Sequence, residues 1–196
     1  MKLLVLFSFF ACVALAAAQT PCVSPGVFEA KAYAFDHHER NFVIGKISYD
    51  ENQERVRLVD AEYENSNLGQ YDTLYAFKEK TQYRVDMKTK ECTKSPLTGD
   101  YFPFGIFPKS TYTGSFILGS LSGPGTGVIV QEWYYKNADG GSVWVQLYTE
   151  HGCLPIQAIF IGHDSAGEEI DYHYEYMDVT LGVQDPAVFD VPKECL

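Results

Sequence analysis

The sequence lacks most of the signatures that mark catalysis or metal binding. It contains no G-x-S-x-G nucleophile elbow and no D-x-[DN]-x-[DN]-G-x₅-E calcium loop. The glycine-rich run 123–127 has no G-K-[ST] ending and no helix after it that could present amide groups to phosphate. Since no nucleophile–base pair can be picked out either, we expect a protein that is not an enzyme and requires no cofactor.

Glycosylation signals and basic clusters are also absent. None of the asparagines lies in an N-x-S/T sequon, so no N-linked glycan is expected. No basic cluster offsets the acidic composition, with 26 Asp and Glu against 15 Lys and Arg. Such a chain repels phosphate backbones, which excludes nucleic acid as an expected partner. The charge favours calcium or basic partners instead, although no metal ligands can be assigned from the sequence.

Only one long apolar run is present, from Leu3 to Ala18, directly after Met1-Lys2. One positive charge, an apolar stretch and a small-residue Ala16-Ala17-Ala18 ending predict a signal peptide over residues 1–18. No later segment is apolar enough to span a membrane. We therefore expect a secreted, extracellular protein in which residues 19–196 form a single domain, with a net charge of −12 because Lys2 is removed.

Cysteines are few, and their spacing excludes the common zinc sites. No two of them lie within C-x₂₋₄-C spacing. Cys12 belongs to the predicted signal peptide, which leaves Cys22, Cys92, Cys153 and Cys195. An even number in an exported chain predicts two disulfides, but spacing alone leaves all three pairings open.

The remaining chain has the composition of a β protein. Methionine is rare, long helical patterns are missing, and β-branched and aromatic runs alternate with polar turns from Phe28 to Leu181. This pattern predicts about ten strands in antiparallel sheets. The proline- and glycine-rich segment 96–108 predicts an irregular loop, and 185–189 predicts a helical turn.

Aromatic side chains, at 15% of the sequence, exceed what a compact core of this size needs. The surplus indicates a lined cavity for an apolar ligand. The candidate lining residues are Trp133, Trp144, Phe160, Tyr174 and, in the irregular loop, Phe102, Phe104 and Phe107.

Several short motifs, in order along the chain, resemble the ependymin family. They are Cys22 three residues before Pro25, Tyr83-Arg84-Val85-Asp86 followed by Cys92-Thr93-Lys94, Val130-Gln131-Glu132-Trp133, Cys153-Leu154-Pro155, and the run 181–189 followed by Pro192 and Cys195. Each motif alone is weak, but together they cover essentially all of residues 19–196.

The resemblance implies an all-β fold with little α-helix. It implies two stacked, curved antiparallel sheets that enclose an apolar pocket, similar to the bacterial lipoprotein-carrier fold. It further implies a homodimer, binding of fatty acids or other lipids, and the disulfides Cys22–Cys153 and Cys92–Cys195. Calcium binding and calcium-dependent cell–matrix adhesion are attributed to the family.

The chain departs from the vertebrate members of that family in two respects. Those relatives carry six mature cysteines and N-linked glycans, whereas this chain has four and no sequon. Delivery to lysosomes through glycan tags is therefore not expected, and release to the extracellular space is. Two hypotheses follow: a secreted carrier of an apolar ligand, or an extracellular matrix or signalling component that acts through calcium-dependent contacts.

Overall fold

The computed structural model describes residues 19–64, 67–138, 141–163 and 167–196. The predicted signal peptide, residues 1–18, lies outside this described part of the chain. The strands are β1 (Val27–Asp36), β2 (Asn41–Asp50), β3 (Arg55–Glu64), β4 (Asn67–Ala76), β5 (Thr81–Asp86), β6 (Cys92–Pro96), β7 (Thr111–Gly119), β8 (Gly127–Lys136), β9 (Val143–Thr149), β10 (Pro155–His163) and β11 (Glu169–Leu181). Two 3-10 turns follow, η1 (Pro186–Phe189) and η2 (Lys193–Cys195).

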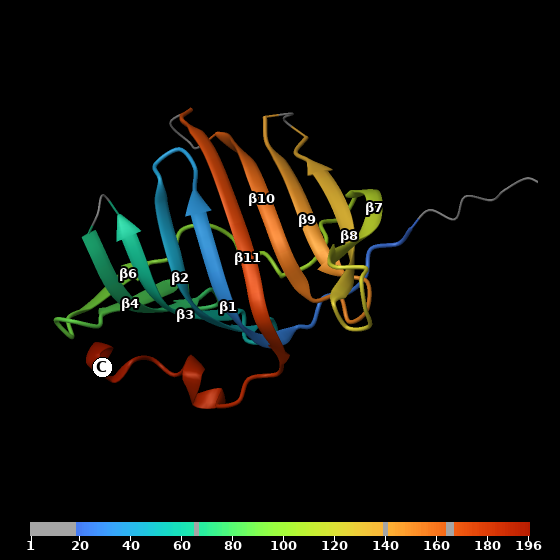
Figure 1. The fold of residues 1–196 in the computed structure, drawn as a ribbon. Coiled ribbons are helices and arrows are strands. Elements are labelled where there is room, and N and C mark those ends of the chain that lie inside the picture. Colours follow the sequence, from blue (N-terminus) through green and yellow to red (C-terminus); the bar gives the residue numbers. More distant parts are fainter. Residues whose placement is uncertain (1–18, 65–66, 139–140, 164–166) are drawn as a thin grey trace, which may run out of the picture.

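All eleven strands belong to one twisted antiparallel sheet in the order β6-β5-β4-β3-β2-β1-β11-β10-β9-β8-β7 (Figure 1). The all-β class and the antiparallel pairing are thus confirmed, and the arrangement is consistent with a lipoprotein-carrier-like fold. Where two stacked sheets were expected, the structure has a single one. The reason is that β11 pairs with β1 on one side and with β10 on the other, which joins the early and late hairpins into one ladder.

Aspartates set several of the tight turns between strands. The Asp36 carboxylate accepts hydrogen bonds from the backbone N–H groups of His38 and Glu39. The Asp50 carboxylate accepts from Gln53 and the Asp86 carboxylate from Lys88 and Thr89, in the same way. Aspartate favours such turns because its short side chain replaces a backbone acceptor.

The two faces of the sheet are covered by different segments. On one face, here called the loop face, Phe28, Ala30, Ile47 and Tyr49 form a buried core under the irregular loop 97–110. The opposite face, here called the tail face, receives the C-terminal tail 182–196, whose Phe189 is buried. Side chains alternate between these faces along each strand, as expected for a sheet.

The strands β6 and β7 were not predicted. The β6 segment is short and largely polar, and β7 has a register shift between Tyr112 and Gly114 and is exposed at almost every position, so neither shows the two-residue hydrophobic period. The predicted helical turn is confirmed as η1, which the Asp185 side chain caps. Within the described ranges, no helix is long and apolar enough to cross a membrane.

Two disulfides connect early and late parts of the chain, in the pairing that the resemblance implied. Cys22 is bonded to Cys153, and Cys92 on β6 is bonded to Cys195 in η2. Their sequence separations of 131 and 103 residues are long, and closing such loops in the unfolded chain is worth about 4–5 kcal/mol by the chain-entropy model. The second bond fixes the end of the tail to the edge of the sheet.

Candidate functional site

The loop face contains a cavity of about 150 Å³ between loop 97–110 and the strands β9, β10 and β11. The loop lines it with aromatic and small residues. The strands contribute the rest of the wall. The lining residues are Phe102, Pro103, Phe104, Gly105, Phe107, Trp144, Gln146, Tyr148, Pro155, Gln157, Ala158 and Tyr176. The cavity is smaller than the 300–1,000 Å³ typical of sites for small-molecule ligands, so a lipid chain fits only if the loop moves outward.

Hydrogen bonds from the sheet hold loop 97–110 in place. The Gln146 side chain donates to the Gly105 carbonyl over 2.9 Å and accepts from the Phe107 N–H over 3.2 Å. The Tyr49 hydroxyl accepts hydrogen bonds from the Phe104 N–H and from the Tyr101 hydroxyl. Ring contacts of Phe104 and Phe107 with aromatic side chains of the strands add to these hydrogen bonds, and no continuous ladder joins the loop to the sheet.

Four of the predicted pocket residues line the cavity: Phe102, Phe104, Phe107 and Trp144. Phe160 and Tyr174 lie beside the lining on the same face, where their rings contact Trp144 at centroid distances of 4.7 and 6.4 Å.

Trp133 is not part of this cavity. Its side chain is only 1% exposed, and it packs against Tyr112 while its indole N–H donates to Gln131. It is a core residue of the β7–β8 end of the sheet.

Sequence reasoning missed Tyr148 and Tyr176, which complete the aromatic wall. Burial raises the pKa of both hydroxyls, and it raises the pKa of nearby Tyr174 to about 12. All three phenols therefore stay neutral at physiological pH. Tyr176 could have been found from its two-residue spacing to Tyr174, which places both on one face of the strand.

A second, more polar hollow of about 400 Å³ lies on the tail face under η1. Its floor includes Glu29, Lys46 and Arg57, and the tail supplies Gln184 and Asp185. Glu29 forms an ion pair with Lys46 over 2.7 Å and accepts a hydrogen bond from Ser48. Val59, Ala187 and Val188 complete the lining, so the hollow combines an ion pair with apolar side chains.

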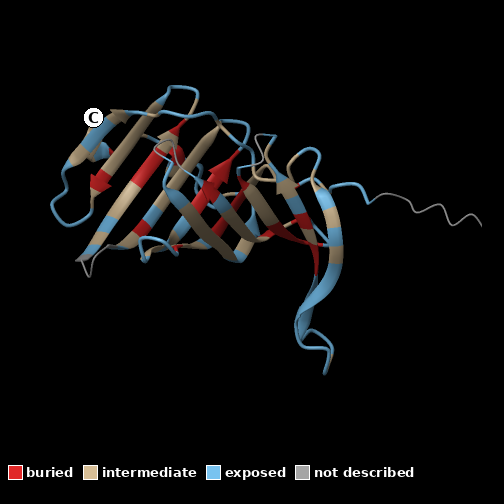
Figure 2. Cartoon of the chain, turned by 90° about the horizontal axis from the view of Figure 1, so that it is seen from above, coloured by how far each residue is buried: buried red, intermediate tan, exposed pale blue. Residues whose placement is uncertain are grey.

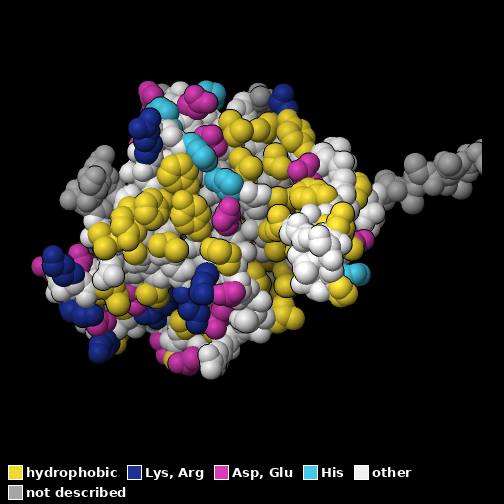
Figure 3. All heavy atoms as spheres, in the orientation of Figure 1, with side chains coloured by type: hydrophobic (Ala, Val, Ile, Leu, Met, Phe, Trp, Pro, Cys, Tyr) yellow, Lys and Arg dark blue, Asp and Glu magenta, His cyan; other side chains and the backbone are white. Residues whose placement is uncertain are grey.

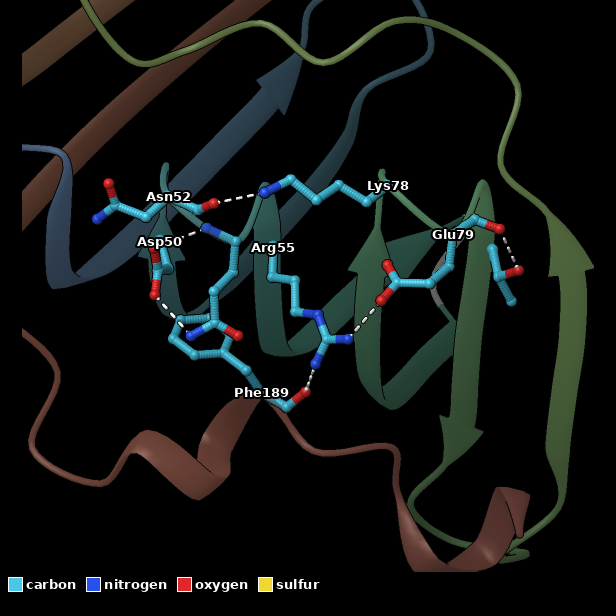
Figure 4. Close-up of polar contacts among 8 residues, drawn as sticks. Asp50, Asn52, Arg55, Lys78, Glu79 and Phe189 are labelled. Carbon is cyan, nitrogen blue, oxygen red and sulfur yellow. Dashed lines mark hydrogen bonds and ion pairs between the residues drawn. The ribbon is translucent and has the colours of Figure 1, made fainter.

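Two arginines fasten the tail above this hollow. Arg57 contacts both carboxylate oxygens of Asp72, at 2.6 and 2.5 Å, and donates to the Val188 carbonyl. Arg55 donates to the Phe189 carbonyl and pairs with Glu79 (Figure 4). The tail thus depends on side chains of β3, although it shares no ladder with that strand.

The tail face also carries apolar side chains in the open. Figure 3 shows two apolar regions separated by histidine and acidic side chains. Exposed apolar side chains on this face include Ile44, Tyr63, Tyr134, Ile161 and Met177, each 36–45% exposed. Nothing within the described residues covers these side chains.

The β7–β8 hairpin is a further exposed apolar segment. Residues 110–131 contain no charged side chain. Phe116, Leu118 and Val128 on one face of the hairpin and Ile117 and Ile129 on the other are 39–45% exposed. Figure 2 shows this end of the sheet projecting beyond the buried strands.

Comparison with known proteins places the chain among its relatives. Residues 65–195 match the Ependymin family. The chain belongs to the ependymin family. It is 30% identical over 179 residues to mammalian ependymin-related protein 1 of Mus musculus, covering 89% of this chain and 76% of the relative. It is 24% identical over 184 residues to ependymin-related protein 2 of Haliotis asinina, covering 89% of each.

A solved structure supports the fold of this ependymin-family chain. An uncharacterized conserved protein from Thermus thermophilus superimposes with a TM-score of 0.52 and 10% sequence identity, covering 86% of this chain and 87% of that one. At that identity the similarity concerns the fold alone.

The described part of this ependymin-family chain contains no preformed metal site. No group of three or more His, Cys, Asp and Glu side chains lies together there in a way that could hold a metal ion. The rings of His37 and His173 stack at 6.2 Å between centroids, and His173 contacts Gln157 and Glu175. The expected calcium site thus remains a prediction from net charge and resemblance.

Proposed function

We propose that this ependymin-family protein is a secreted, non-enzymatic carrier that holds an apolar ligand, such as a lipid chain, between loop 97–110 and the sheet. The observation that carries the proposal is the aromatic cavity itself. It lies on the loop face, is lined by Phe104, Phe107, Trp144 and Tyr176, and is covered by a loop that is joined to the sheet by side-chain hydrogen bonds and ring contacts and not by a ladder. The disulfides support secretion, since they persist in oxidising compartments.

Filling the cavity tests this function. We expect the wild-type protein to bind Nile red, a neutral apolar dye, saturably, and dodecanol to displace it. Ala158→Leu places a larger side chain in the lining, so we expect affinity to fall by about tenfold, or about 1.4 kcal/mol. Fluorescence titration measures the dye affinity of each protein and the displacement of the dye by dodecanol.

Ala61→Leu is the matched control, because Ala61 points to the tail face of β3 opposite Ile44. It should leave dye affinity unchanged. Absence of saturable dye binding in the wild type, or an equal loss of dye affinity in both variants, would contradict the carrier function.

A second candidate, contact with another protein at the exposed apolar surface, is favoured by the β7–β8 hairpin. We propose a second copy of this chain as its partner, which also fits the homodimer implied by the resemblance. Two copies of an acidic chain repel each other, and the uncharged segment 110–131 is where they approach at least electrostatic cost. The edge strand β7 also offers unpaired ladder groups to such a partner. Calcium-dependent matrix adhesion remains the alternative role of this surface.

A charge in the hairpin tests this assembly. Phe116→Glu puts a carboxylate where two acidic copies would meet, so we expect light scattering to show a shift from dimer to monomer. Ile44→Glu is the matched control, because Ile44 is equally exposed but lies on β2, away from the hairpin. A wild-type monomer at all concentrations, or a dimer that survives Phe116→Glu, would contradict the proposal. Repeating the measurement with calcium and with a chelator tests the calcium dependence.

A further inference from the structure

Asp60 on β3 is a buried carboxyl group whose neighbouring hydrogen-bonding group is a second acid, Glu62. The residue is 6% exposed, and neither carboxyl oxygen accepts a hydrogen bond from a donor group within the described residues. The Thr73 hydroxyl on the neighbouring strand β4 is in the same condition, at 1% exposed. Leaving such groups unsatisfied costs about 1–3 kcal/mol each, and a donor group bound there would remove that cost.

The side chains of Asp60 and Thr73 lie on the loop face and are diagonal neighbours. Asp60 pairs with Tyr71 in the register, and Thr73 follows Tyr71 by two residues on the same face. Diagonal neighbours are about 7–8 Å apart between backbones, which is too far for direct contact of these short side chains. One small group with several hydrogen-bond donors, placed between them, would donate both to the Asp60 carboxylate and to the Thr73 hydroxyl oxygen.

The charge around Asp60 is not balanced. Glu62 lies two residues along the same strand and face, and Arg84 pairs with it over 2.7 Å. The guanidinium of Arg84 also lies 3.7 Å from the centre of the Tyr71 ring. Arg84 is thus engaged by Glu62 and Tyr71, and the pair of carboxylates retains one uncompensated negative charge when both are ionised.

A strip of small side chains connects this site with the aromatic cavity. In the register, Asp60 lies opposite Gly45, Gly45 opposite Ala32, and Ala32 opposite Tyr176, which lines the cavity. At about 4.8 Å per strand, Asp60 and Tyr176 are about 14 Å apart. Ala32 and Gly45 stay partly exposed between them, so no bulky side chain of this row blocks the path.

We propose that Asp60 and Glu62 receive the ammonium group of an amphiphile whose hydrocarbon chain runs over Gly45 and Ala32 into the cavity at Tyr176. This inference rests on the apolar-ligand function proposed above and specifies the polar end of the ligand as an amine rather than a carboxylate. An ammonium group has three donors and the opposite charge, which satisfies Asp60, Glu62 and the Thr73 oxygen together. A fatty-acid carboxylate would be repelled by the same pair.

The test uses three ligands of equal chain length, dodecylamine, dodecanol and dodecanoate, each below its critical micelle concentration at neutral pH. Isothermal titration of the whole secreted protein should show dodecylamine binding at least about tenfold more tightly than dodecanoate, equivalent to about 1.4 kcal/mol. Asp60→Asn should abolish this preference, and it should change dodecanol affinity much less than dodecylamine affinity because the alcohol carries no charge. Glu62→Gln should reduce the preference, and Glu169→Gln, at the distant end of β11 on the tail face, should not affect it.

The outcomes separate the two proposals. If none of the three ligands binds, the carrier function itself fails. If all three bind with equal affinity, the carrier function stands and the amine site is wrong, with Asp60 hydrated by water alone. An amine preference that survives Asp60→Asn would also overturn the assignment. Circular dichroism and thermal unfolding show that each variant is folded before it is titrated.

Discussion

Replacing Arg57 with alanine is expected to lower the free energy of unfolding by about 3 kcal/mol, measured by urea denaturation. The reason is that Arg57 and Asp72 are each only 16% exposed, so the substitution leaves a mostly buried carboxylate without its cation. Breaking such a buried pair by removing one partner costs about 3–5 kcal/mol, and partial exposure reduces that value here. The loss of the hydrogen bond to Val188 also loosens the tail, which hydrogen exchange over residues 186–190 would reveal.

Two further variants test whether the buried Arg57–Asp72 pair causes this loss of stability. Arg55→Ala removes a similar contact to the tail, but its partner Glu79 is 46% exposed, so we expect a loss of about 1 kcal/mol or less. The double variant Arg57→Ala/Asp72→Ala should recover part of the loss because no unpaired carboxylate remains. If Arg57→Ala is no more harmful than Arg55→Ala, the buried pair does not fasten the tail.

Local sequence signals predicted the hairpins well, because their causes are local. The side chains of Asp36 and Asp50 accept hydrogen bonds from backbone N–H groups two or three residues away, so a few neighbouring residues determine each turn. The irregular loop was equally visible, since Pro103 and Pro108 have no N–H to donate to a ladder. Pro96, the first residue of the predicted loop, is instead the last residue of the edge strand β6. β7 was missed because both of its faces are exposed, and an exposed strand shows no alternation to detect.

The site could be predicted only in part, because it depends on which distant strands meet. Phe104 and Phe107 were candidates because apolar rings in an irregular loop must be buried somewhere. That Phe107 contacts Trp144 and not Trp133 follows from the strand order, in which β9 lies next to β10 and β8 lies nearer the edge. Asp60 looked like an ordinary polar position, since only the register shows that Gly45 and Tyr71 flank it.

Replacing Asp60 with asparagine is expected to stabilise the ligand-free protein at pH 8 by about 3 kcal/mol. Burial, with a further contribution from the nearby Glu62 carboxylate, raises the pKa of Asp60 from 3.8 to about 7. The folded protein therefore holds a proton between about pH 4 and pH 7 that the unfolded chain has released, and stability falls as pH rises through that range. A rise of this size is worth about 4 kcal/mol, and sharing of the proton with Glu62 reduces the value assigned to Asp60.

The pH profile of unfolding distinguishes this explanation from a simple change in packing. Near pH 4 the wild type and Asp60→Asn should be almost equally stable, and the gap should open between pH 5 and pH 8. Glu169→Gln, a matched change on an exposed acid, should leave the profile unchanged. A gap that is constant with pH would show that Asp60 does not titrate in this range. A variant that gains stability at pH 8 while losing its preference for dodecylamine would mean that the folded protein keeps the buried Asp60 carboxyl beside Glu62 for binding and not for stability.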